Sequence, residues 1–240
     1  MSRYLFPLLL SMAFPAQAGW RDLLGDFMGD GQAQEVAGAA LSGEEVTQGL
    51  REALATGAKR AVRSLGRPGG FLDNPKVRIP LPGKLGMIGD ALSRIGQGEK
   101  VDAFIASMNH AAEQAVPKAT DIFIDAISKM SFEDARRILE GPDDAATRYL
   151  QRSASADLER EMLPLVSDAT SAVGVTRRYK ELLAAAGPVA RLAGDSLDLD
   201  RYVTGKALEG LFLVLAEEEA RIRHDPVARS SELLRKVFGD

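Results

Sequence analysis

The stretch SFEDARRILEGPDDAATRYL, residues 131–150, specifies its own geometry more fully than any other part of the chain. Ser131, followed three residues later by Asp134, is a near match to a capping box, in which both side chains accept hydrogen bonds from free backbone donors of the first turn. The pattern therefore predicts a helix that begins at this serine. Its apolar stripe repeats at helical spacing and consists of Phe132, Ala135, Ile138 and Leu139.

After this helix the sequence predicts a sharp stop and a second helix. Gly141 tolerates a left-handed helix ending, and Pro142 fits the first position of a following helix, where its missing N–H costs nothing. Asp143 and Asp144 then fall in the first turn of that helix, where the helix dipole favours negative charge. We expect an αα-hairpin against which the other helices pack.

Helical patterns continue along most of the chain. Ser42 and Glu45 form a capping box that opens a helix ending near Leu65, and Asp198 is placed to cap another. The run ALEGLFLVLA, residues 207–216, is apolar on nearly every side and predicts the central buried helix. With no convincing strand, the sequence predicts an all-α fold, a single irregular bundle of about eight to ten helices.

One long loop interrupts this pattern. Residues 66–82, GRPGGFLDNPKVRIPLP, carry four of the eleven prolines, each of which removes a backbone donor and fixes φ, so the segment cannot be helical. A connection of this length is usually functional or disordered. Apolar residues along it indicate that it packs against the bundle: Phe71, Leu72, Val77, Ile79 and Leu81.

The N-terminal residues have the three parts of a signal peptide. A positive start is followed by an apolar run and by Ala16-Gln17-Ala18, so we expect cleavage between Ala18 and Gly19. The run, about eleven residues, is shorter than the roughly 20 that span a bilayer, so we predict no transmembrane segment in the mature chain. We expect a signal peptide at 1–18, an arm and linker at 19–41, a helical domain at 42–240, and a periplasmic location.

The composition is that of a globular protein, with 45% hydrophobic and 27% charged residues, and the formal charge of −4 gives no reason to expect nucleic acid as the partner. Residues 51–84 nevertheless contain eight Lys or Arg against two carboxylates. An anion, an acidic polymer of the envelope or a lipid headgroup could bind here. Alternatively, the ten carboxylates of residues 99–147 neutralise these charges within the chain. For the chain as a whole we expect an anionic envelope component or a protein as the partner. The predicted ligand-binding residues are Arg67, Lys76, Arg78, Arg136 and Arg148.

A metal site is an alternative. His110 and Glu113 lie three residues apart on one predicted helix, which places an imidazole and a carboxylate on the same face, and Asp121 and Asp125 can complete the site. An ordinary surface pair explains the same residues, and we predict no metal or other cofactor. The chain has no cysteine, no G-x-S-x-G and no phosphate-binding glycine motif, so enzymatic activity is not favoured.

Several long motifs, together with the leader, resemble the bacterial DUF4197 proteins, a family of unknown function. They are GFLDNPKVRIPLP at 70–82, AVPKATDIFIDAISKMSFEDARRILEGPDDAATRY at 115–149 and ALEGLFLVLAEEEARIRHDPVARSSELLRKVFG at 207–239. The resemblance implies an exported, all-helical protein and brings no activity, ligand or catalytic residue. Many members look like lipoproteins with a cysteine after the leader, and this chain has none.

Three hypotheses follow. The first is a non-catalytic periplasmic module that uses the loop 66–82 and its neighbouring basic residues to bind an anionic or apolar partner. The second is a metal-dependent or carboxylate-based hydrolase built on His110, Glu113, Asp121 and Asp125. The third is an envelope structural or assembly protein held to its partner by the terminal helices.

Overall fold

The computed structural model describes residues 42–193 and 197–224. The predicted signal peptide at 1–18, the arm and linker at 19–41 and the last predicted helix, after residue 224, lie outside the described residues. Within the described part, helices contain 80% of the residues and no strand is present, which confirms the all-α class. The expected total of eight to ten helices concerns the whole chain and stays a prediction.

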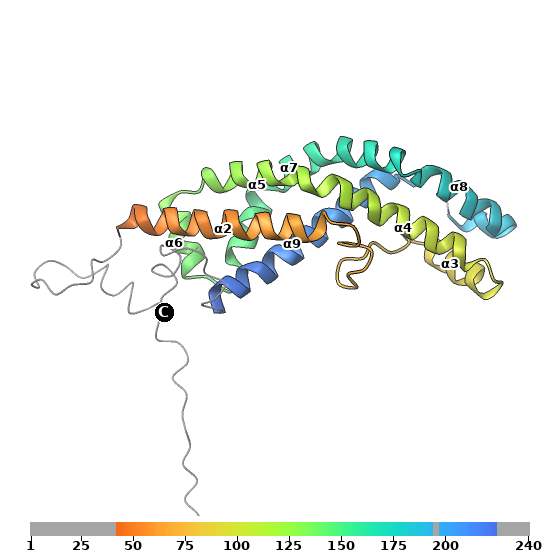
Figure 1. Ribbon diagram of the computed structural model, residues 1–240, viewed down its shortest axis with the longest axis horizontal. Helices are drawn as coiled ribbons and strands as arrows, with labels where there is room; N and C mark the ends of the chain where they lie inside the picture. Colours follow the sequence, from red (N-terminus) through yellow and green to blue (C-terminus); the bar gives the residue numbers. More distant parts are fainter. Residues whose placement is uncertain (1–41, 194–196, 225–240) are drawn as a thin grey trace, which may run out of the picture.

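The helices follow one another with short connections, apart from the loop 66–82 (Figure 1). Short 3₁₀ segments, η1 (Val116–Lys118) and η2 (Gly187–Ala193), follow α4 and α8. The α-helices are α2 (Gly43–Leu65), α3 (Leu85–Arg94), α4 (Gly98–Ala115), α5 (Ala119–Ser128), α6 (Phe132–Leu139), α7 (Ala145–Ala172), α8 (Val175–Ala186) and α9 (Leu199–His224).

The bundle is elongated. Helix α6 lies towards one end, α3 and α8 lie at the other, and α9 runs obliquely across the bundle (Figure 1). Helix α9 packs against α7 and α2, and α4 packs against α7 and α8. Most of the run 207–216 is buried, as predicted, but Glu209 and Leu213 are exposed, so one side of this helix faces solvent. Its buried side chains are Ala207, Leu208, Leu211, Phe212, Val214 and Leu215.

Local capping signals predicted the helix starts well. Ser42 and Glu45 form the expected capping box of α2, and Ser131 and Asp134 form that of α6. Asp198 caps α9, since the Arg201 N–H donates to its Oδ1 at 2.9 Å. Each of these signals lies within three residues of the donors that it satisfies, which is why sequence alone reveals it.

The turn between α6 and α7 differs from the prediction. Gly141 is not among the glycines with positive φ; instead, a Cβ there would lie 2.6 Å from the Ala145 Cβ and 2.9 Å from the Arg137 carbonyl oxygen. Close approach of the two helices, rather than a left-handed ending, therefore requires this glycine. Helix α7 begins at Ala145, so Pro142 and the two following aspartates precede it.

Candidate functional site

The loop 66–82 is fixed to α4 by two buried polar side chains. The first is Asn109, whose Oδ1 accepts the Ile79 N–H at 2.8 Å, while its Nδ2 donates to the Ile79 carbonyl oxygen at 2.9 Å. An asparagine side chain thus satisfies both backbone groups of one loop residue, as a neighbouring strand would. Of the five loop residues expected to pack, Phe71, Val77 and Ile79 are buried, whereas Leu72 and Leu81 are only half-buried.

The second anchor is Glu113, one turn further along α4. Its Oε1 accepts the N–H groups of Phe71 at 3.0 Å and Leu72 at 3.1 Å, and its Oε2 lies 3.0 Å from Nδ1 of His110. Burial raises the pKa of Glu113, whereas the hydrogen bonds from His110, Leu72 and Phe71 lower it, and the net effect is a lowered pKa. Glu113 is therefore a buried carboxylate that holds backbone donors of the loop.

These hydrogen bonds account for the positions of His110 and Glu113, so no metal is needed to explain why the two side chains lie together. Asp121 and Asp125, the other two residues of the proposed metal site, are exposed, and Asp125 pairs with Lys129 at 2.5 Å. In the part of the chain that the structure describes, no group of three or more His, Cys, Asp or Glu side chains is placed to hold a metal ion. The structure assigns Glu113 to the support of the loop.

The predicted basic residues of the loop have different surroundings. Lys76 pairs with Glu217 of α9 at 2.7 Å, so its charge is neutralised within the chain. Arg78 is exposed and forms no ion pair with a described residue. Arg67 lies two residues after the end of α2 and joins a cluster that was not predicted as a site.

This cluster surrounds a depression of about 510 Å³, which we call the basic hollow. Its cations are Lys59, Arg63 and Arg67, which follow one another at intervals of four residues and so share one side of the α2 C-terminus. The other lining residues are Val62, Gly66, Pro117 and Thr120, so no described carboxylate lines the hollow. The regular spacing is visible in the sequence, but only the fold separates these three cations from the other basic residues of 51–84.

The acidic residues 99–147 do not neutralise the cations of the basic hollow. Lys59, Arg63 and Arg67 form no ion pair or hydrogen bond with any described side chain. Several of the acidic residues instead pair with neighbours on their own helix, as Asp125 does with Lys129 and Glu140 does with Arg136. The three cations of the hollow are therefore available to an external anion.

The two remaining predicted residues, Arg136 and Arg148, lie in the hairpin of α6 and α7. Arg136 pairs with Glu140 at 2.9 Å, and Arg148 pairs with Asp144 at 2.8 Å. Both arginines are exposed, and they do not meet the basic residues of the loop. Arg148 also lines a second depression between the two helices.

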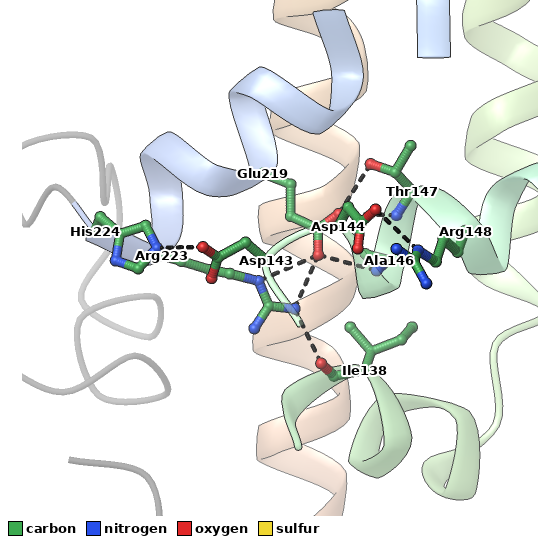
Figure 2. A network of polar contacts seen from close by, with 9 residues as sticks. All are labelled: Ile138, Asp143, Asp144, Ala146, Thr147, Arg148, Glu219, Arg223 and His224. Carbon is green, nitrogen blue, oxygen red and sulfur yellow. Dashed lines mark hydrogen bonds and ion pairs between the residues drawn. The ribbon is translucent and has the colours of Figure 1, made fainter. Parts of the chain in front are cut away.

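A buried ion pair of α9 holds this hairpin together (Figure 2). Glu219 accepts the N–H groups of Ala146 at 2.9 Å and Thr147 at 2.8 Å, so a distant helix caps the start of α7. Arg223 donates to Glu219 at 2.8 Å and to the Ile138 carbonyl oxygen at 2.9 Å. Both side chains of this i,i+4 pair are only 5% exposed, so the pair is buried although helical spacing alone would equally allow a surface pair.

Comparison with known proteins agrees with the motifs. Residues 40–239 match the family model described as "Protein of unknown function (DUF4197)". The chain belongs to the DUF4197 family. No curated protein and no solved structure matches this DUF4197 chain. Among its described helices, none combines the length and the hydropathy needed to cross a bilayer.

Proposed function

We propose that this DUF4197 protein is a non-catalytic binding module for an anionic partner, which it meets at the basic hollow. The observation that carries the proposal is the row of Lys59, Arg63 and Arg67, which line one depression with no described carboxylate beside them. Charges of one sign around a concave surface reinforce one another and raise the local concentration of counter-ions.

The spacing of the row favours a partner with repeated anionic groups. Lys59 and Arg63 lie four helical residues, or about 6 Å, apart along α2, and Arg67 follows just after the helix end, so the three cations can meet several charges of an extended chain. Two of the three are arginines, whose planar guanidinium binds a carboxylate or phosphate through two parallel hydrogen bonds. An acidic polymer fits this arrangement better than a single small anion does.

The loop supports the position of the hollow. The Gly70 N–H donates to the Arg67 carbonyl oxygen at 2.9 Å, and the next two residues donate to Glu113. The backbone that carries Arg67 is therefore joined to α4 through a short series of hydrogen bonds. Fixed backbone lowers the entropy cost of binding, although the arginine side chain itself remains exposed.

A lipid surface is less well supported as the partner. Membrane-surface proteins usually insert apolar side chains next to their cations. The large exposed hydrophobic residues of the described chain do not line the basic hollow; they are Met87, Ile95, Phe132, Val189 and Leu213. With export by the predicted signal peptide, which is also a proposal, the partner would be an anionic component of the envelope.

Binding of long-chain polyphosphate, measured by isothermal titration calorimetry at low salt, tests the proposal. In the test variant, Lys59, Arg63 and Arg67 are all replaced by Gln. Three exposed contacts worth roughly 0.5 kcal/mol each predict a loss of about tenfold in affinity. The control variant removes the same charge elsewhere, through Gln at Arg94, Arg160 and Lys180.

The proposal predicts that the control retains most of the affinity and that the affinity of the unmodified chain falls as salt is added. Equal affinity of both variants would show that net charge alone drives binding and would contradict the proposal. Anionic vesicles provide a further comparison. Binding to vesicles with no binding to polyphosphate would assign the hollow to a lipid surface instead.

The other two hypotheses have less support. The hydrolase requires His110, Glu113, Asp121 and Asp125 to converge, and Glu113 is occupied by the loop. The assembly hypothesis depends on the terminal helices, and the last predicted helix lies outside the described residues.

A further inference from the structure

The hairpin of α6 and α7 encloses a second depression, of about 480 Å³, which we call the hairpin pocket. This volume falls within the usual range for small-molecule sites, roughly 300–1,000 Å³. Three arginines line it: Arg137 comes from α6, and Arg148 and Arg152 lie one turn apart on α7. The basic hollow shares no lining residue with this pocket.

The charges of the hairpin pocket are only partly neutralised. Arg137 pairs with Asp134 at 2.6 Å, and Arg148 pairs with Asp144 at 2.8 Å. Arg152 forms no ion pair or hydrogen bond with a described residue. Because Asp134 is the only carboxylate among the described lining residues, the pocket retains an excess of positive charge.

The rest of the lining suits an apolar group. Ile138, Pro142 and Ala145 contribute aliphatic surface, and the ring of Tyr149 is partly buried against the core. Burial and the nearby Asp134 carboxylate raise the pKa of Tyr149, so its hydroxyl remains a hydrogen-bond donor at neutral pH. An apolar wall beside unpaired arginine is the combination expected for an organic anion.

The backbone on both sides of the hairpin pocket is held by side chains of α9. Arg223 holds the Ile138 carbonyl group and Glu219 holds the N–H of Ala146, so the buried ion pair of α9 sets the distance between the two helices (Figure 2). Figure 2 also shows Arg148 beside Asp144 at the start of α7. A preformed backbone with exposed arginines at the rim of the pocket can bind a small ligand without reorganising.

We propose that the hairpin pocket binds a small organic anion, a molecule with one carboxylate or phosphate group on an apolar body. The anionic group is held by Arg152, with Arg137 and Arg148 beside it, and the apolar body lies against Tyr149 and Ile138. This site is separate from the basic hollow and does not depend on the function proposed for it.

Calorimetric titration of the purified chain with phenyl phosphate, benzoate and neutral benzyl alcohol tests the proposal. The test variant is Arg152→Gln, and the matched control is Arg160→Gln, which removes the same charge from α7 outside the pocket lining. We expect at least one of the two anions to bind the unmodified chain. Loss of one charge-assisted contact should weaken binding about tenfold in the test variant and leave the control unchanged.

The preferred anion identifies the ligand class, since tighter binding of phenyl phosphate assigns a phosphate and tighter binding of benzoate a carboxylate. The variant with Gln at Lys59, Arg63 and Arg67 should bind the anion as the unmodified chain does, which separates this site from the basic hollow. The proposal is overturned if neither anion binds at millimolar concentration, if benzyl alcohol binds equally well, or if Arg152→Gln has no effect.

Discussion

Glu113 and Asn109 show how two side chains can order a proline-rich loop that has no regular structure of its own. They lie one turn apart on α4, and each satisfies backbone groups of the loop that would otherwise be buried without a partner. An unsatisfied buried donor costs roughly 1–3 kcal/mol, so these contacts decide whether the loop packs. The basic hollow depends on this order, because Arg67 precedes the anchored segment.

Glu113 should make the stability of the protein sensitive to acid. A carboxyl group whose pKa is lowered on folding stabilises the folded state above its ordinary pKa of 4.5, and this stabilisation is lost as the pH falls through the lower folded pKa. Glu113→Gln removes the titration but keeps the shape. We therefore expect the difference in unfolding free energy between the unmodified chain and this variant to be constant near neutral pH and to shrink in acid.

Urea unfolding at a series of pH values measures this difference. Glu99→Gln, which removes one charge from the exposed side of the same helix, is the control. A difference between the unmodified chain and Glu113→Gln that stays the same down to pH ~3 would contradict the role given to this carboxylate.

At the scale of elements, α9 organises the bundle by packing and by one buried ion pair. The two residues of the pair have unequal roles. Glu219 caps the first turn of α7 and neutralises Arg223, whereas Arg223 neutralises Glu219 and holds one carbonyl group of α6. The backbone donors of α7 remain paired with the glutamate even when the arginine is absent.

Removal of the glutamate should therefore be the more damaging change. Breaking a buried pair costs about 3–5 kcal/mol, and we expect Glu219→Leu to reach this range because it removes both the carboxylate that pairs with buried Arg223 and the acceptor of the α7 backbone donors. Arg223→Leu should cost less. Glu217→Leu, which breaks the exposed pair with Lys76, should cost roughly 1 kcal/mol or less. Chemical denaturation of the three variants gives the order, and an equal cost for the two buried changes would contradict it.

The contact between α9 and the loop makes opposite predictions for two glycines of one helix. A Cβ at Gly210 would lie 2.9 Å from the Phe71 ring and 3.1 Å from the Val77 Cβ, whereas a Cβ at Gly205 would meet nothing within 4 Å. Gly210→Ala should destabilise the protein by about 1–3 kcal/mol through overpacking. Gly205→Ala should stabilise it by roughly 0.5–1 kcal/mol through backbone entropy.

Thermal unfolding of the two alanine variants is sufficient for this comparison. Hydrogen exchange of residues 66–82 should also increase in Gly210→Ala and remain unchanged in Gly205→Ala. Similar stability of the two variants would mean that the loop does not pack against α9 as described.

The sequence predicted those features that depend on near neighbours. Ser42 and Ser131 each form a capping box with a carboxylate three residues away, and this short pattern predicts where the two helices begin. Glu219 and Ala146 are separated by 73 residues, so no local pattern reveals that one caps the other. Charge pairing has the same limit. Lys76 and Lys59 are both basic, but only the fold shows that Lys76 meets Glu217, 141 residues away, while Lys59 pairs with no described residue.

At the scale of the whole molecule, the elongated bundle presents two basic depressions with different surroundings. The basic hollow lies where α2 ends and η1 joins α5, and the hairpin pocket lies between α6 and α7. The first has an uninterrupted row of cations, and the second combines cations with apolar walls. This difference is the reason for assigning a polymeric anion to one and a small organic anion to the other.

The most direct test of the central claim is to map the polyphosphate contact residue by residue, by two-dimensional NMR of the isotope-labelled chain. We expect the largest shift changes at residues 59–67 and 117–120, and we expect them to be lost when Lys59, Arg63 and Arg67 are replaced by Gln. Shift changes centred on α3 and α8, or spread evenly over all exposed basic residues, would contradict it.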